Sequence, residues 1–231
     1  MHPLPAMTQA QAAAISGCLS APRVHRYLNA VLPTAGTAAL INALKLYRWN
    51  VEVCAALMVP IHLCEVTVRN AADEALTAVY GPQWPWSPGL RQALPNPSSP
   101  HYNPRRDLIA TAGAQPTTGK VIPELKLAFW SHLFTYRHDN RLWRPLLHQV
   151  LPHADQGRPA ASIRGEIRLA IEQMRELRNR IAHHEPIYGR ALPDDMTCMR
   201  TLVGYRSSDM LAWLDHVETV SALITRRPAT R

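Results

Sequence analysis

The chain has 231 residues, of which 47% are hydrophobic and 18% are charged. This balance excludes an intrinsically disordered chain and leaves enough apolar material for a well-packed core. The net charge is +8, and only three of the 25 basic residues are lysine. The planar guanidinium of arginine matches the geometry of phosphate, so this composition favours contact with nucleic acid. A GC-rich genome would raise the arginine, alanine and proline content just as well.

The four cysteines show none of the short spacings of a zinc or redox motif. They are expected to be reduced, as in a cytoplasmic protein. No uninterrupted apolar run is long enough to span a bilayer, so no membrane partner is expected.

Every predicted element is a helix, because apolar residues recur at steps of three and four and no stretch alternates like a strand. The longest predicted helix covers roughly residues 37–80, and Pro60 either kinks it or begins a second helix. Further helices are predicted over residues 24–32, 105–112, 121–137, 141–154 and 162–185, with one or two more between 194 and 225.

Residues 81–120 hold 8 of the 20 prolines and form a long inserted connection or loop. Connections of this length within compact domains are usually functional or disordered. Trp84, Trp86 and Tyr102 predict that this one packs on the rest of the protein. The predicted fold class is all-α, a bundle of long antiparallel helices in which residues 1–231 form one domain and 81–120 are a Pro-rich insertion.

The stretch "LRNRIAHHEPIY", residues 177–188, carries most of the chemistry. On a helical wheel with Ile181 at the centre of the buried face, Asn179 and His183 fall together on the side away from the core. They are i,i+4 neighbours whose side chains can touch. Arg178 lies on the flank of the buried face, about 7.5 Å along the helix axis from His183.

These three residue types suit cleavage of RNA without a metal ion. His183 lies in the last turn, where the helix dipole stabilises a cation, and histidine exchanges protons near neutral pH. Arg178 can hold a phosphate or a developing oxyanion, and the amide of Asn179 can orient the imidazole. The plainer interpretation is a solvated, charge-rich helix face.

The segment "RNRIAH", Arg178–His183, matches an Arg-polar-x-x-x-His signature and resembles the HEPN superfamily, all-α proteins that are mostly ribonucleases. Two further blocks are similar to the Abi-like family of abortive-infection proteins within it. These blocks are Leu46–Gly81, with a Glu-x-x-x-Arg-Asn pattern at Glu65, Arg69 and Asn70, and Gly119–Phe134. The resemblance covers most of residues 40–220.

The resemblance implies an HEPN-like fold and a metal-independent, cofactor-free endoribonuclease that acts in phage defence or as a toxin. Arg178 and His183 would be the catalytic pair, and Asn179 would orient them. Members of the superfamily are typically dimers in which two motif helices face each other across a composite site. A homodimer is therefore expected, with RNA as substrate and an antitoxin or a regulatory RNA as a further partner.

Glu65, Arg69, Asn70 and Arg175 are candidates for substrate binding. Glu65 and Arg69 are also i,i+4 neighbours, so a structural ion pair explains them equally well. Another possible role for the motif is a non-catalytic RNA- or partner-binding HEPN module, which would not need His183.

A metal site is not expected. His183, His184 and Glu185 are consecutive, so on a helix they point in different directions. Helical zinc hydrolases use two histidines four residues apart with a glutamate between them, and this spacing is absent here.

Overall fold

The computed structural model describes residues 7–32 and 36–230, with the backbone alone at Thr37. Over these ranges the protein is all-α, as predicted, and the only strand-like pairing there is one isolated bridge between Val31 and Thr230. The helices are α1 (Gln9–Cys18), α2 (Ala21–Ala30), α3 (Thr37–Tyr80), α4 (Pro88–Ala93), α5 (Pro104–Ala114), α6 (Thr118–Glu124), α7 (Leu127–Leu133), α8 (Arg144–Val150), α9 (Ala160–Ala182), α10 (Leu192–Arg206), α11 (Ser208–Val217) and α12 (Val220–Ile224). Single turns at Trp84–Trp86, Tyr136–His138 and Asp139–Trp143 connect some of them.

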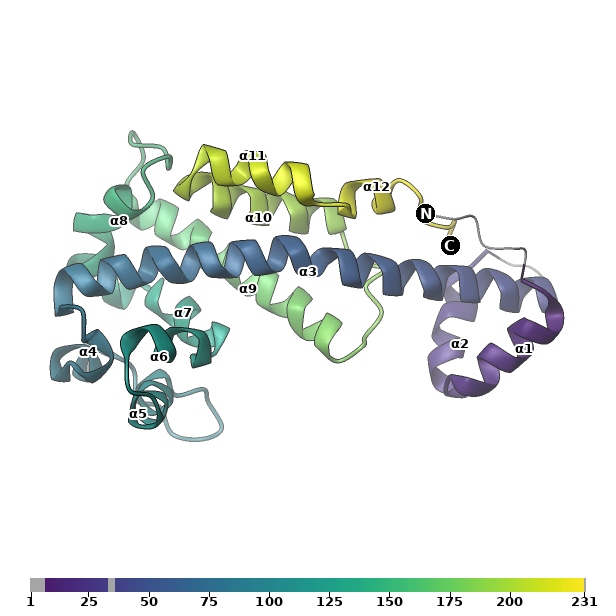
Figure 1. Cartoon of the computed structure of the whole chain (residues 1–231), viewed down its shortest axis with the longest axis horizontal. Helices are drawn as coiled ribbons and strands as arrows, with labels where there is room; N and C mark the ends of the chain where they lie inside the picture. The colour runs from purple at the N-terminus through teal and green to yellow at the C-terminus, as the bar shows by residue number, and fades with distance from the viewer. Residues whose placement is uncertain (1–6, 33–35, 231) are drawn as a thin grey trace.

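Helix α3 has 44 residues and runs along the long axis of the molecule (Figure 1). Helices α1 and α2 lie at its first end, and α4 to α8 gather at its second end. Helix α9 crosses it obliquely in the opposite direction, while α10 packs against both α3 and α9 and is covered by α11. Among the described helices only α3 and α9, with 44 and 23 residues, exceed 15 residues. The expected bundle is therefore one long antiparallel pair completed by shorter helices.

Pro60 does not divide α3, so the helix predicted over residues 37–80 forms as one element. The helix is held by one buried face, because fully buried side chains recur along it at helical spacing. In its central part these are Val53, Leu57, Ile61, Cys64 and Val68. Gly81 ends the helix with φ at +82°, a conformation that glycine adopts without steric cost.

By length and composition alone, the Ala38–Tyr80 part of α3 could cross a bilayer, with a mean hydropathy of 1.7 in its most apolar window. The core helix of a soluble protein passes the same test. Side chains of α3 contribute to the same hydrophobic cluster as those of α7, α9 and α10. The expectation that no membrane partner exists stays a prediction.

Two regions divide into more helices than expected. The single helix predicted over residues 121–137 is two helices, because the backbone is extended at Leu125 and Lys126. The C-terminal region contains three helices where one or two were predicted. There Ser207 starts α11 by accepting a hydrogen bond from the backbone N–H of Met210 at 3.2 Å.

The Pro-rich segment 81–120 is a packed layer of short helices. It contains α4, α5 and the start of α6, and α5 confirms the helix predicted over residues 105–112. Trp84 is fully buried, and its indole N–H donates to Asp73 of α3 at 2.6 Å. Trp86 donates to the carbonyl oxygen of Ala112 at 3.1 Å. The aromatic residues thus anchor the insertion, as the sequence predicted.

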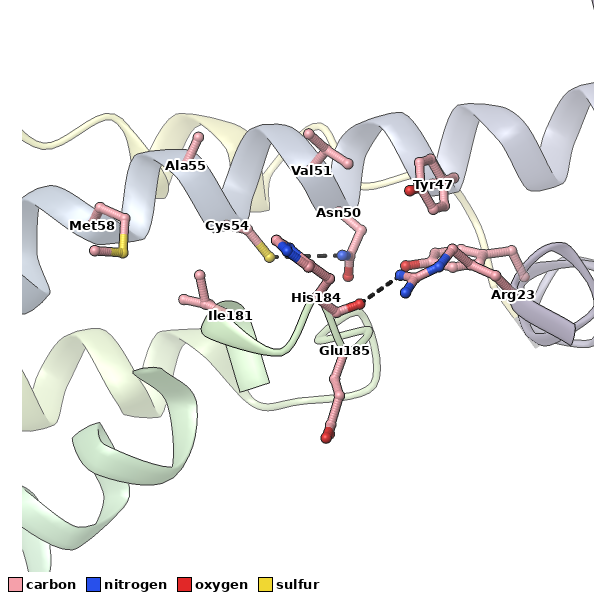
Figure 2. Close-up of a pocket in the computed structure, with 11 residues that line it drawn as sticks. Arg23, Tyr47, Asn50, Val51, Cys54, Ala55, Met58, Ile181, His184 and Glu185 are labelled. Carbon is pink, nitrogen blue, oxygen red and sulfur yellow. Dashed lines mark hydrogen bonds between the residues drawn. The ribbon is translucent and has the colours of Figure 1, made fainter. Parts of the chain in front are cut away.

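The loop after α9 is held against α2 and α3. Helix α9 ends at Ala182, and His184 follows with φ at +55°, a left-handed conformation that costs a non-glycine residue about 1–3 kcal/mol. Arg23 of α2 donates to the carbonyl oxygen of His184 at 2.7 Å (Figure 2). Buried Asn50 of α3 accepts a hydrogen bond from the backbone N–H of Ile187 at 2.8 Å. These contacts fix where the chain turns after α9.

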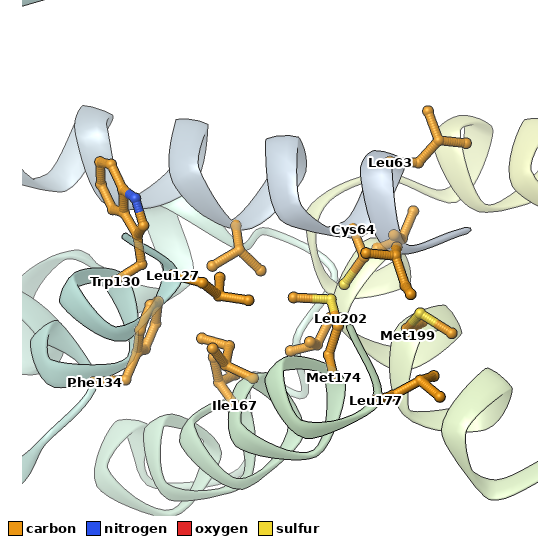
Figure 3. Packing of buried hydrophobic residues seen from close by; sticks show 14 of the residues in the cluster. Leu63, Cys64, Leu127, Trp130, Phe134, Ile167, Met174, Leu177, Met199 and Leu202 are labelled. Atoms are coloured by element: carbon orange, nitrogen blue, oxygen red, sulfur yellow. The ribbon is translucent and has the colours of Figure 1, made fainter. Parts of the chain in front are cut away.

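The hydrophobic core lies where α3, α7, α9 and α10 meet (Figure 3). Met174 and Leu177 of α9 belong to the same buried cluster as Cys64 of α3 and Leu202 of α10. The buried face predicted for the helix over residues 162–185 is therefore the face that packs. This packing leaves the polar face of α9 turned toward α6 and α7 and toward solvent.

We expect Trp84→Ala to lower the free energy of unfolding by about 3–5 kcal/mol, because it removes a fully buried indole and its hydrogen bond to Asp73. Equilibrium unfolding in urea measures this change. Trp213→Ala is the matched control, since the Trp213 side chain is 53% exposed and its loss should change stability by about 0.5 kcal/mol or less. Equal effects of the two substitutions would contradict the anchoring role of Trp84.

Candidate functional site

A polar hollow of about 380 Å³ opens where the last turns of α9 meet α3 and the junction of α6 with α7. We call it the arginine hollow. Arg175, Arg178 and Asn179 reach it from α9, Arg69 from α3 and Lys126 from the α6–α7 junction. Four cationic side chains surround this opening, which favours an anion. Glu124 also lines it, and Glu65, Glu172 and Asp107 form ion pairs with the four cations. Four residues singled out from the sequence therefore line the same hollow.

Glu65 joins two of these arginines. Its Oε1 accepts a short, charge-assisted hydrogen bond from Arg69 one helical turn away on α3. Its Oε2 lies 3.6 Å from Nε of Arg178 on α9. The side chains of Glu65 and Arg69 are only 13% and 15% exposed, whereas Arg178 is 45% exposed. One partly buried carboxylate thus ties α3 to α9 and leaves the guanidinium of Arg178 open to solvent.

Arg69 is held on its other side by backbone carbonyl groups. It donates to the carbonyl oxygen of Pro123 at 3.2 Å and to that of Leu125 at 3.4 Å. Burial lowers the pKa of Arg69, Glu65 opposes this shift, and Arg178 adds to it. Arginine still remains protonated at neutral pH. Arg69 is therefore a fixed cation whose position is set by three elements.

Arg175 is positioned by a second carboxylate. Its Nε donates to Glu172 at 2.8 Å, and Glu172 accepts a short hydrogen bond from the buried hydroxyl of Ser131 on α7. Burial alone would raise the pKa of Glu172, but the hydrogen bonds from Ser131 and Arg175 outweigh burial and hold the pKa below its ordinary value. The carboxylate therefore stays ionised and keeps Arg175 at the edge of the arginine hollow.

The side chain of His183 lines a different hollow. His183 is the C-cap of α9, with its backbone N–H donating to the carbonyl oxygen of Asn179 at 2.9 Å. Its exposed side chain lines a smaller hollow of about 200 Å³, together with Arg23 and Arg26 of α2. We call it the histidine hollow. Within the described part of the chain, no side-chain hydrogen bond joins Asn179 to His183, although the helical wheel places them on one side.

The other residues near the two hollows differ in whether they line one and in whether the sequence pointed to them. Asn70 is exposed on α3 and does not line the arginine hollow. His184, which the wheel separates from His183, lines the histidine hollow as well. Lys126, Arg23 and Arg26 were not singled out from the sequence. They come from segments distant in the chain, and no local pattern links them to α9.

No group of three or more His, Cys, Asp or Glu side chains within the described ranges is arranged to hold a metal ion. One glutamate lines each hollow, Glu124 and Glu185, but the other charged and amide side chains there are arginine, lysine, asparagine and histidine. These groups suit a phosphate more than a cation, because they are hydrogen-bond donors and carry positive charge. Independence from metal stays a prediction.

The fold and these two hollows define an all-α protein with a cluster of fixed cations in one hollow and a histidine at a helix end in another. Comparison with models of known protein families, with curated proteins and with solved structures finds no match to this chain. The resemblance to the Abi-like family therefore stays a prediction from the sequence blocks quoted above.

We expect Glu65→Gln to lower the free energy of unfolding by about 1.5–3 kcal/mol, because it leaves two arginines without their shared carboxylate. Glu52→Gln is the matched control on the same helix. Glu52 pairs with Arg48 at the same spacing of four residues, but the Glu52 and Arg48 side chains are 31% and 44% exposed. The free energy of unfolding should therefore fall by only about 0.3–0.5 kcal/mol. Denaturant titration of both variants would refute the anchoring role of Glu65 if their losses were equal.

Proposed function

We propose that the protein is a metal-independent endoribonuclease of the HEPN type, with an HEPN-like fold. The observation that supports this most strongly is the arginine hollow. Four residues chosen from the sequence alone, Arg69, Arg175, Arg178 and Asn179, come together there from two helices. Guanidinium groups held by carboxylates are suited to bind a phosphate of the RNA backbone.

The proposed reaction needs only proton transfer and charge stabilisation. A base takes the proton of the 2′-hydroxyl group, and this oxygen bonds to the adjacent phosphorus. The bond from phosphorus to the 5′-oxygen breaks, and that oxygen takes a proton from an acid. His183 is the proposed acid–base group, and Arg178 is the proposed ligand for the charged phosphate oxygens. The products are a 2′,3′-cyclic phosphate and a 5′-hydroxyl end.

The separation of Arg178 from His183 supports a composite site. In one chain these residues line different hollows. We therefore propose a homodimer in which the ends of two α9 helices face each other, so that His183 of one chain completes the arginine hollow of its partner. This arrangement brings a proton-transfer group to a bound phosphate without moving α9.

In this proposal the enzyme acts in the cytoplasm in abortive infection, as a phage-defence protein or a toxin. An antitoxin or a regulatory RNA would restrain it. Brief induction should then arrest growth, and induction of the His183→Ala variant should not.

The alternative is an RNA- or partner-binding module that does not cleave. The same separation of Arg178 from His183 favours it, because the arginine hollow could bind a phosphate on its own. The two functions differ in what His183→Ala does to RNA. In a binding module, loss of His183 leaves both RNA binding and RNA integrity unchanged.

We expect His183→Ala to slow RNA cleavage by about 10²–10⁴-fold, through loss of proton transfer, and Arg178→Ala by about 10²–10³-fold, through loss of charge stabilisation. Both side chains are exposed, so both variants should fold. Sequencing of RNA ends from purified protein with EDTA present measures cleavage and the chemistry of the ends. His153→Ala and Arg168→Ala, which remove exposed side chains outside both hollows, are the controls. Cleavage that requires added magnesium would contradict the mechanism.

Mixing inactive variants tests the composite site separately. If His183 and Arg178 of one site come from different chains, a mixture of Arg178→Ala and His183→Ala should regain cleavage, because each mixed dimer holds one intact pair. Sedimentation should show a dimer at the assay concentration. A mixture that stays inactive while dimers form would show that each chain carries its own complete site.

A further inference from the structure

A third hollow, of about 370 Å³, lies between α3 and the loop after α9, next to the histidine hollow (Figure 2). We call it the apolar hollow. Val51, Ala55 and Met58 line it from α3, and Ile181 lines it from the end of α9. Its volume is within the range of small-molecule sites, which combine apolar walls with a few polar groups.

The walls of the apolar hollow are held in place. Asn50 is 5% exposed, and it accepts from the backbone N–H of Ile187 and donates to the sulfur of Cys54 at 3.7 Å. His184 has a left-handed backbone, which non-glycine residues adopt rarely, and its carbonyl oxygen is bound by Arg23. The opening is therefore formed by ordered contacts between α2, α3 and the loop.

Aromatic and polar side chains stand at the end of the apolar hollow nearest α2. Tyr27 and Tyr47 line it there, with their rings 5.0 Å apart in an edge-to-face arrangement. Tyr27 is only 2% exposed, so Tyr47 and the apolar side chains are the groups that can pack on a planar heterocycle. Stacking of this kind tolerates different bases.

The apolar and histidine hollows adjoin, because Arg23, Tyr27, His184 and Glu185 line both. Across this shared wall the character changes from apolar to cationic. Neither Arg23 nor Arg26 forms an ion pair within the described residues, whereas Glu185 faces Arg180 at 3.7 Å. Among the described residues, the histidine hollow therefore offers two arginines that form no ion pair, although Glu185 also lines it.

We propose that the two hollows together bind one nucleotide unit of RNA, with the base in the apolar hollow and its phosphate in the histidine hollow. The apolar end removes a flat ring from water, and Arg23 and Arg26 supply donors for phosphate oxygens. An apolar peptide side chain would fill only the first hollow and leave the cations unused. This inference rests on the proposed ribonuclease function: the phosphate in the histidine hollow belongs to another nucleotide of the same RNA than the phosphate that reacts in the arginine hollow.

Ala55→Trp tests this assignment. Ala55 is exposed on α3 and lines only the apolar hollow among the three, so an indole there occupies the space of the base without disturbing the core. Ala78→Trp is the matched control, since Ala78 is an exposed alanine of the same helix that lines none of the three. Thermal unfolding of both variants verifies that they fold.

Equilibrium titrations use the four nucleoside 5′-monophosphates and inorganic phosphate as probes. We expect at least one nucleotide to bind the wild-type protein and the Ala78→Trp variant equally, and to bind the Ala55→Trp variant at least tenfold more weakly. Arg26→Ala should weaken binding of the same nucleotide. Binding of inorganic phosphate should be unchanged by Ala55→Trp. The proposal is overturned if no nucleotide binds, or if Ala55→Trp leaves nucleotide binding unchanged.

The cleavage assay separates this inference from the proposed function. If the Ala55→Trp variant cleaves RNA with the wild-type rate and base preference, the proposed ribonuclease function stands and the proposed base site is overturned. If nucleotide binding is weakened by Ala55→Trp but the wild-type protein does not cleave RNA, the proposed nucleotide site stands and the proposed ribonuclease function is overturned. If Ala55→Trp instead converts a dimer into a monomer and leaves nucleotide binding unchanged, the apolar hollow is a contact between chains and the base site is overturned.

Discussion

The whole arrangement depends on the burial of one face of α3. A helix of 44 residues gains little net stability from its own hydrogen bonds, so it persists because other elements cover its apolar face. Helices α7, α9 and α10 provide this cover near its second end, and α2 and α12 pack on it near its first end. The same helix supplies Arg69 to the arginine hollow, Glu65 to the ion pairs beside it, and Asn50 to the loop after α9. Helix α3 therefore both organises the packing and positions residues of the candidate site.

Periodicity predicted the parts of the fold that depend on local sequence. The stripe through Ile61 and Val68 gave the long helix, and that through Ile163 to Leu177 gave the buried face of α9. It did not predict the break at Leu125 and Lys126, where apolar residues continue on both sides and hide the change of direction. That break matters, because it brings Lys126 to the arginine hollow.

The sequence predicted the angular positions of the site residues around α9 better than it predicted which hollow each side chain lines. A helical wheel grouped Asn179 with His183 on the side away from the core. The two side chains line different hollows, and His184 lines the same hollow as His183. The wheel could not show that the helix stops at Ala182 or that His183 faces α2. Glu65 was weighed equally as a structural residue and a substrate ligand. Its ion pair with Arg69 and its position near Arg178 support the structural role, and a role in substrate binding stays a prediction.

The contact between Arg23 and His184 has a consequence for the order of folding. These residues are 161 positions apart, so their hydrogen bond closes one of the longest loops in the chain. Closing such a loop costs conformational entropy before its contacts compensate, which delays long-range contacts relative to local helices. During synthesis α2 emerges well before its partner on the loop after α9. The histidine hollow is thus completed only after the 161 positions between Arg23 and His184 have been translated.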